Sequence, residues 1–320
     1  MLREGLIFLS RNAVAKAVVT RTPLRAMAGR FVPGERVDDL VRAIKDANGE
    51  GVLGIANFLG ESVHDEKTVR IFADTYFEII ERIHAESLRA YVSVKFTALG
   101  QDISDGFLAQ NLERILERAR QARVFIRFDM ESSEYTQRTL DAFEKLWAEG
   151  WRDIGVVLQS YLKRSAGDVA RMNRLGVPVR LCKGAYNEPP EVAFKDKRDV
   201  DNNFVVLMKA LMSEGYYPAL ATHDERMLDA TIAFHQKQGI PKERFEFQLL
   251  HGVRRDLQRQ LVKDGFNVRV YIPFGSHWYP YLMRRLAERP ANMLFMAGAV
   301  VKETPLGFLW PRTKDGAHHG

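Results

Sequence analysis

One pattern recurs eight times along the chain: a short run rich in β-forming residues is followed, in most cases, by a longer stretch with helical periodicity. In residues 107–122 and 137–149, apolar side chains recur every three or four positions, as they do on one face of a helix. The short runs lie at 52–59, 90–96, 124–130, 154–160, 178–184, 217–223, 245–252 and 266–274. Strands that alternate with helices in this way predict a parallel sheet covered by helices.

Eight such units over about 240 residues match the size of a (β/α)8 barrel, also called a TIM barrel. We therefore expect an α/β protein with this architecture. An open doubly wound sheet is the alternative, because periodicity alone does not show that a sheet closes. The expected domain organisation is an N-terminal helical segment at 1–48, a catalytic barrel at 49–290, and an apolar C-terminal segment with a tail at 291–320.

Most of the short runs end in ionisable or hydrogen-bonding residues, and the active sites of β/α barrels form at the C-terminal ends of the strands. Residues two apart on a strand share a face, so Ser93 with Lys95, and Arg127 with Asp129, are expected to point the same way. The strand-end residues are Lys95, Asp129, Gln159, Arg180, Lys183, Thr222, His223, Gln248 and Tyr271. Their density favours an enzyme over a binding barrel without catalytic activity.

Composition narrows the functional classes further. The net charge of +6 comes from 47 basic and 41 acidic side chains without a long basic run, so we expect no nucleic-acid partner. Cys182 is the single cysteine, which excludes an intramolecular disulfide and favours a cytoplasmic, reducing compartment. The uncharged segment at 290–301 is too short to span a membrane, so any membrane contact is expected to be peripheral.

Several common site motifs are missing or misplaced. Gly49, Gly51 and Gly54 fit the pattern Gly-x-Gly-x-x-Gly, but they follow a predicted helix and precede a predicted strand. A phosphate-binding turn has the opposite context, so we interpret these glycines as a helix end and a loop. The histidines do not have metal-ligand spacing, and no Gly-x-Ser-x-Gly elbow occurs, so neither a metal site nor a serine hydrolase is expected.

Lysines at barrel strand ends allow a second chemistry. Lys95 or Lys183 could form a Schiff base with a carbonyl substrate, as in aldolases, if burial lowered its pKa. A further polar group follows the last strand, where Tyr281, Arg284, Arg285 and Glu288 share one helix face. A neighbouring arginine pair suits a carboxylate ligand, although an ordinary solvated helix face has the same spacing.

The strand ends, read in order, resemble the bacterial monofunctional proline dehydrogenase (proline oxidase) family over most of the barrel. The motifs that carry the resemblance are Val-Lys-Phe-Thr at 94–97, Phe-Asp-Met-Glu at 128–131, Val-Leu-Gln-Ser-Tyr at 157–161, Val-Arg-Leu-Cys-Lys-Gly-Ala-Tyr at 179–186, Ala-Thr-His-Asp at 221–224, Phe-Glu-Phe-Gln-Leu-Leu-His-Gly at 245–252, Val-Tyr-Ile-Pro-Phe-Gly at 270–275 and Tyr-Leu-Met-Arg-Arg-Leu-Ala-Glu at 281–288. The resemblance implies a distorted barrel with N-terminal helices and an eighth helix over the barrel mouth. It also implies oxidation of L-proline to 1-pyrroline-5-carboxylate, the first step of proline catabolism to glutamate.

The resemblance assigns a substrate site and a gate. Arg284, Arg285 and Lys95 are expected to bind the carboxylate of L-proline, and Glu61 to pair with Arg284 and close the site. The residues expected to shape the rest of the pocket are Tyr271, Tyr281, Leu250 and Glu288.

The same resemblance implies FAD, bound without a covalent link. Asp129 and Arg180 are the expected catalytic residues, with Arg180 beside the flavin and Asp129 holding Arg180 and Lys95 in place. The expected flavin contacts are Met130, Gln159, Arg180, Lys183, Gly184, Ala185, Tyr186, Thr222, His223 and Gln248. Asn187 stands where related bifunctional enzymes have tryptophan, and the tail at 314–320 matches no pattern that we recognise.

The resemblance also implies partners. Electrons are expected to pass to a membrane quinone, and the product to a separate pyrroline-5-carboxylate dehydrogenase through transient contact. The apolar segment at 292–311 is expected to pack on the barrel or, with Leu309 and Trp310, to contact the inner face of the membrane.

Overall fold

The computed structural model describes residues 28–288, with the backbone alone for 284–288. Residues Val32–Gly275 form one compact unit. The described residues 28–31 and 276–288 belong to a second unit, which contains helix α12 (Trp278–Glu288).

Eight parallel strands of the first unit form a closed barrel in sequence order. The barrel closes where β1 pairs with β8 from Leu53 opposite Arg269 to Phe58 opposite Phe274, which confirms the expected fold and rules out the open sheet. The strands are β1 (Leu53–Phe58), β2 (Ala90–Val94), β3 (Ile126–Phe128), β4 (Ile154–Gln159), β5 (Pro178–Cys182), β6 (Tyr216–Ala221), β7 (Glu246–Leu250) and β8 (Asn267–Phe274). Each strand overlaps one predicted run, and several stop earlier because their polar C-terminal residues leave the ladder and begin the loops.

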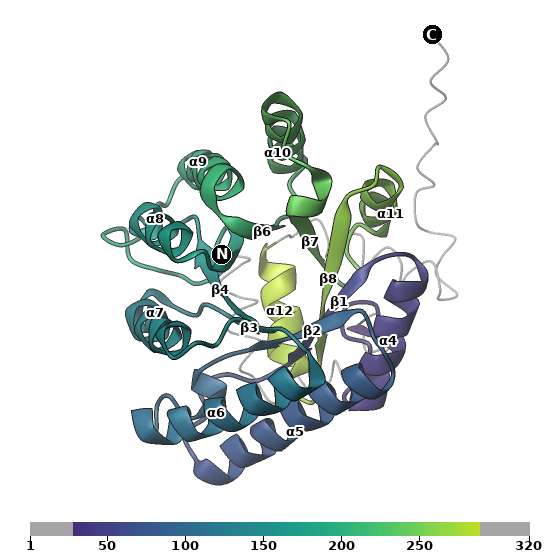
Figure 1. The fold of residues 1–320 in the computed structure, drawn as a ribbon, viewed down its shortest axis with the longest axis vertical. Coiled ribbons are helices and arrows are strands. Elements are labelled where there is room, and N and C mark those ends of the chain that lie inside the picture. Colours follow the sequence, from purple (N-terminus) through teal and green to yellow (C-terminus); the bar gives the residue numbers. More distant parts are fainter. Residues whose placement is uncertain (1–27, 289–320) are drawn as a thin grey trace, which may run out of the picture. The chain divides into compact units, whose positions relative to one another are not determined.

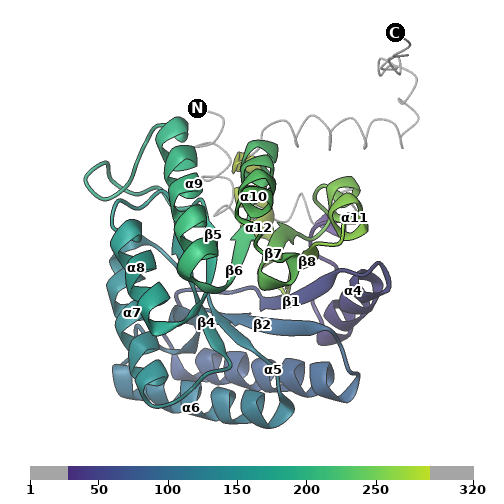
Figure 2. The ribbon, with the colours of Figure 1, turned by 45° about the horizontal axis from the view of Figure 1, so that its top comes forward.

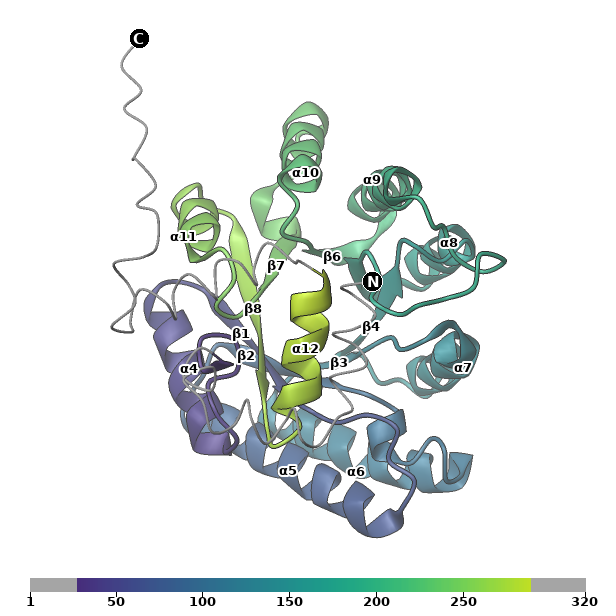
Figure 3. The ribbon, with the colours of Figure 1, turned by 180° about the vertical axis from the view of Figure 1, so that it is seen from behind.

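Helices surround these strands, as Figures 1 and 3 show from opposite sides and Figure 2 from an oblique angle. They are α4 (Val37–Gly49), α5 (Glu66–Ala85), α6 (Asp105–Ala122), α7 (Ser133–Ala148), α8 (Ser165–Leu175), α9 (Lys197–Glu214), α10 (Glu225–Gln238) and α11 (Arg255–Lys263), with short 3-10 turns at Thr97–Leu99 and Lys242–Arg244. Side-chain caps begin several of them, such as Asp65, which accepts the Thr68 N–H of α5 at 2.8 Å. Helix α4 ends at Gly49 and β1 begins at Leu53, so the glycine motif lies in the predicted helix-to-strand context.

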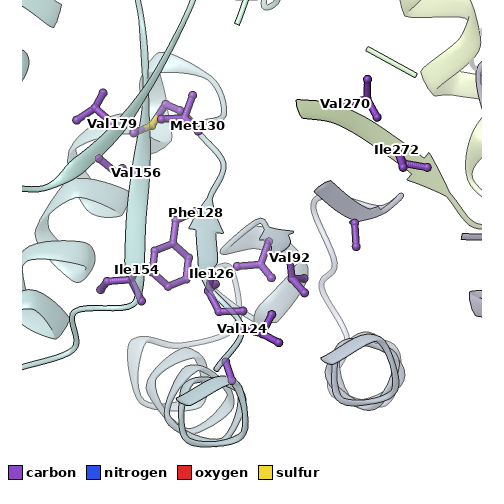
Figure 4. Packing of buried hydrophobic residues seen from close by; sticks show 14 of the residues in the cluster. Val92, Val124, Ile126, Phe128, Met130, Ile154, Val156, Val179, Val270 and Ile272 are labelled. Carbon is purple, nitrogen blue, oxygen red and sulfur yellow. The ribbon is translucent and has the colours of Figure 1, made fainter. Parts of the chain in front are cut away.

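Alternation along each strand separates two environments. Outward-facing residues such as Val92, Phe128 and Val156 are fully buried in one apolar core with residues of the surrounding helices. Figure 4 shows part of this packing. The residues between them carry polar side chains into the barrel interior, including Ser93 and Arg127, which are 0% and 2% exposed. The alternation therefore places apolar side chains in the core that stabilises the fold and polar side chains together inside the barrel.

Some of the predictions concern residues outside the described range of 28–288. Residues 1–27 and the segments at 292–311 and 314–320 lie outside the described residues, and the placement of the 281–288 helix over the barrel mouth stays a prediction, as do the domain boundaries. In the described range, 28–288, no helix is long and apolar enough to cross a membrane.

We predict that Gly155→Ala lowers the free energy of unfolding by about 1–3 kcal/mol, as overpacking of a core does. A Cβ at Gly155 in β4 would lie 2.6 Å from both Arg127 Nη1 and Pro178 O, so the buried arginine would have to move. The matched control is Gly167→Ala in α8, where a Cβ meets nothing within 4 Å and alanine favours the helix. Denaturant unfolding of the two variants checks this, and equal stabilities would contradict it.

Candidate active site

The carboxylate of Asp129, just after β3, joins donors from three other strands. Its Oδ1 accepts hydrogen bonds from Ser93 Oγ at 2.6 Å and from Arg180 Nη2 at 3.0 Å. Its Oδ2 accepts the Tyr271 hydroxyl at 2.6 Å and lies 3.5 Å from Lys95 Nζ. Arg180 Nη2 also donates to Ser93 Oγ at 2.8 Å, so the cluster is closed on itself. The expectation that Asp129 holds Arg180 and Lys95 agrees with this geometry.

Burial and the neighbouring charges both shift the pKa values of this cluster. Asp129 and Arg180 are 8% and 6% exposed. Burial alone would raise the pKa of Asp129, but Arg180 and Lys95 beside it hold that pKa below its usual value. Burial would likewise lower the pKa values of Arg180 and Lys95, and Asp129 raises both instead. One anion therefore keeps two cations charged inside the barrel.

A second polar layer lies below this cluster. Glu246 Oε1 of β7 accepts hydrogen bonds from Arg269 Nε at 2.9 Å and Gln248 Nε2 at 2.5 Å, and Gln248 Nε2 also donates to the Tyr91 hydroxyl at 2.8 Å. Because an ionised carboxylate only accepts, Glu246 fixes which side of the Gln248 amide faces it. Among the described residues, Gln248 Oε1 and Arg180 Nε are buried polar atoms without a hydrogen-bond partner.

Lys183 follows β5 and is held between two carboxylates. Its Nζ lies 2.5 Å from Asp201 Oδ1 and 2.7 Å from Asp224 Oδ2. Burial opposes ionisation of Asp224, yet Lys183 holds the pKa of that carboxyl at about 2. A Schiff-base lysine needs a lowered pKa, whereas Lys95 is shifted upward and Lys183 is ion-paired, so the site opposes the aldolase alternative.

Other predicted flavin contacts lie at the last residue of β4 and in the loops after β3 and β6. The Gln159 amide donates to Glu131 O at 2.8 Å. Met130, which precedes Glu131 in the sequence, is 6% exposed. His223 Nε2 accepts the Leu250 N–H at 2.9 Å, which places the proton of a neutral imidazole on Nδ1. Thr222 is buried next to it. These residues share the C-terminal end of the barrel with the Asp129 cluster.

Glu61 follows β1, and its charge helps to raise the pKa of Lys95. The rest of the predicted substrate site stays a prediction. Tyr281 belongs to α12 in the second unit, and Arg284, Arg285 and Glu288 are described only as part of that helix.

Sequence reasoning assigned no role to several residues that organise the site. Ser93 was singled out only for sharing a face with Lys95, yet it connects Asp129 to Arg180. Glu131 ends the Phe-Asp-Met-Glu motif and accepts hydrogen bonds from the hydroxyl of Thr97 at 2.7 Å and from its N–H at 3.4 Å. Asp201 and Asp224, which pair with Lys183 and neutralise its charge, also had no assigned role.

We predict a pH-dependent contribution of Glu131 to stability. Burial raises its pKa from 4.5 to about 7, so the folded chain holds a proton that the unfolded chain releases between these values. The stabilisation is therefore present below about pH 4.5 and is lost as the pH rises to about 7, by about 3 kcal/mol in all.

Denaturant unfolding at about pH 5 and about pH 8 measures this difference. Compared with the wild type, Glu131→Gln should lose less stability over this interval, whereas Glu134→Gln, a change of an exposed carboxyl on α7, should follow the wild type. A wild type and a Glu131→Gln variant with parallel pH dependence would contradict the prediction.

Comparisons with known proteins agree with this architecture. The proline dehydrogenase family model matches residues 40–298. The chain is 36% identical over 301 residues to "Proline dehydrogenase 2" of Bacillus subtilis, covering 94% of this chain and 99% of that protein. It is 40% identical over 288 residues to "Proline dehydrogenase" of Deinococcus radiodurans, covering 89% of this chain and 93% of that protein.

A solved structure of proline utilization A (PutA) from Bdellovibrio bacteriovorus, inactivated by N-propargylglycine, has a TM-score of 0.80 and 25% identity. The match covers 100% of this chain but only 41% of the PutA chain, so this chain spans less than half of that protein. The two curated relatives above are instead matched over nearly their whole length. The family match over most of the barrel and these identities show that the chain belongs to the proline dehydrogenase family.

Proposed function

We propose that this chain oxidises L-proline to 1-pyrroline-5-carboxylate with FAD as its cofactor. Membership of the family supports a flavin-dependent enzyme of proline oxidation. The observation that carries the proposal is the buried Asp129 cluster at the C-terminal end of the barrel, which holds Arg180 and Lys95 charged side by side. Such a site suits a redox reaction in which negative charge develops on a bound ring system.

Residues of β5 and β7, and the turn that follows β5, fit a flavin on two observations. Arg180 Nε and Gln248 Oε1 are among the buried polar atoms without a hydrogen-bond partner in the described part of the chain, and they offer a ligand one donor and one acceptor. Gly184 has a φ of +109°, and a Cβ there would lie 2.2 Å from the Tyr161 ring. Only a glycine fits between this turn and the Tyr161 ring, so the turn presents backbone and no side chain at this position.

When bound, a flavin accepts the hydride that proline loses. The chain's own residues would supply fixed charge for that transfer. Arg180 stays protonated because Asp129 faces it, so its positive charge would stabilise negative charge on a reduced flavin held beside it. We propose Asp129 and Arg180 as the catalytic residues on this basis. The proposed cofactor contacts are Met130, Gln159, Arg180, Lys183, Gly184, Ala185, Tyr186, Thr222, His223 and Gln248.

For the substrate, we propose that Lys95, Arg284 and Arg285 bind the proline carboxylate. A guanidinium group offers the paired donors that a carboxylate accepts, and Arg284 and Arg285 are adjacent in the sequence. The proposed pocket is completed by Tyr271, Tyr281, Leu250 and Glu288. Glu61 is proposed to pair with Arg284 and close the site, an idea supported by its electrostatic influence on Lys95.

We further propose that the electrons pass to a membrane quinone and that the product passes to a separate pyrroline-5-carboxylate dehydrogenase. A quinone dissolved in the bilayer requires peripheral contact with the cytoplasmic face of the membrane, and the net charge of +6 favours anionic lipid surfaces.

An anaerobic titration tests the proposed function. The purified protein should show the absorption of an oxidised flavin, proline should bleach it, and quinone-loaded vesicles should then restore it. A Schiff-base aldolase would be colourless and would be inactivated by borohydride in the presence of substrate. A colourless protein that takes up no flavin on reconstitution would overturn the proposal.

The same titration tests the carboxylate assignment. Arg284→Met or Arg285→Met should raise the proline concentration needed for half-bleaching about tenfold or more, because a hydrogen bond to a charged group is lost. Flavin content should stay the same. The control is Arg174→Met, a change of an exposed arginine in the last turn of α8. Glu61→Ala should instead mainly slow the bleaching. Loss of flavin with an unchanged proline requirement would contradict the assignment.

A further inference from the structure

Tyr161, in the loop after β4, packs directly against the turn that follows β5. Its ring occupies the space beside Gly184 that a side chain would otherwise fill. Its N–H donates to Lys183 O at 2.9 Å, and its carbonyl accepts the Phe194 N–H at 2.8 Å. Both ends of the β5–α9 loop are thus tied to one residue.

The phenol of Tyr161 extends this connection to a third loop. Its hydroxyl donates to Glu188 Oε1 at 3.2 Å, and the backbone N–H of Tyr186 donates to the phenol oxygen. Glu188 Oε1 also accepts the Ser133 N–H at 2.7 Å, and Glu188 Oε2 accepts the Ser133 hydroxyl. Ser133 begins α7, directly after the loop that carries Met130. The loops after β3, β4 and β5 therefore meet at one carboxylate.

These hydrogen bonds are costly to lose because both side chains are buried. Tyr161 and Glu188 are 7% and 6% exposed. Burial, together with Glu188, raises the pKa of the Tyr161 hydroxyl, so the phenol stays protonated and donates. A buried carboxylate that loses one of its donors is costly to keep in place, so the loop would move or take in water.

The contacts of Tyr161 are separate from the core of the barrel. Tyr161, Leu162 and Ala193 form a small apolar cluster of their own, and Tyr186 and Val200 pack against it. The large core under the helices does not include this cluster. A change at the phenol should therefore alter the shape of the loop more than the stability of the fold.

We propose that Tyr161 and Glu188 are positioning residues that hold the Gly184–Tyr186 turn in the shape that binds the flavin, with Ser133 as the third point of attachment. The inference rests on the proposed function, which assigns this turn to the flavin. A loop that is fixed before the ligand arrives does not have to be ordered on binding, so the ligand binds more tightly.

Tyr161→Phe tests this by removing one hydroxyl and leaving the ring beside Gly184. The flavin dissociation constant of the apoprotein, measured by fluorescence titration, should rise about tenfold. The matched control is Tyr135→Phe on α7, which removes a hydroxyl that lies 3.2 Å from the carboxylate of Asp102. Thermal melts of the two apoproteins should be alike. Equal flavin affinity in the two variants would overturn the inference.

Three further variants separate positioning from a general loss of stability. Glu188→Gln and Ser133→Ala should each weaken flavin binding, and Tyr161→Phe added to Glu188→Gln should cost little more, because the two changes break one shared network. With flavin at saturation, the proline KM should stay near the wild-type value. Additive losses, or apoprotein melts that fall in step with affinity, would instead indicate separate structural effects and contradict the proposal. A wild-type apoprotein that binds no flavin would overturn the proposed function as well.

Discussion

The buried carboxylate of Asp129 is the interaction on which the candidate active site depends. Two cations and two hydroxyl groups from strands β2, β5 and β8 converge on it. A buried charge is tolerated only when it is paired and hydrogen-bonded, so each partner constrains the position of the others. Arg180 also lies 5.3 Å from the centre of the Tyr271 ring, which adds a cation–π contact to the same cluster. The barrel thereby holds a net positive group without leaving the anion unpaired.

A glycine on β4 leaves room for a second buried cation inside the barrel. Arg127 is 2% exposed and donates to Val156 O and Pro178 O from the space above Gly155. Its guanidinium lies 4.9 Å from the centre of the Phe125 ring. A long cation fits here only because β4 has a glycine at this level. The polar layer that includes Glu246 and Arg269 is thus part of the fold, and the Asp129 cluster above it is where ligand chemistry is proposed.

Much of this could be predicted from the sequence, because it depends on periodicity. Eight strands, their inward-facing polar residues and the pairing of Asp129 with Arg180 and Lys95 follow from alternation, strand ends and the family resemblance. The partners of Lys183 could not be predicted in this way, because Asp201 lies within α9 and Asp224 follows β6. Spacing along the chain does not show which loops meet in space. The hydrogen bonds of Tyr161 and Ser133 to Glu188 join three loops, and they could not be predicted for the same reason.

The most direct test of this account is the rate of flavin reduction by proline in Asp129→Asn, measured anaerobically by stopped flow. The substitution keeps the size of the side chain and removes the charge that Arg180 and Lys95 share. We expect flavin to stay bound while its reduction slows about tenfold or more at saturating proline, because Arg180 and Lys95 lose a charged hydrogen-bond partner. Reduction at the wild-type rate, with unchanged proline affinity, would contradict the central role of this carboxylate.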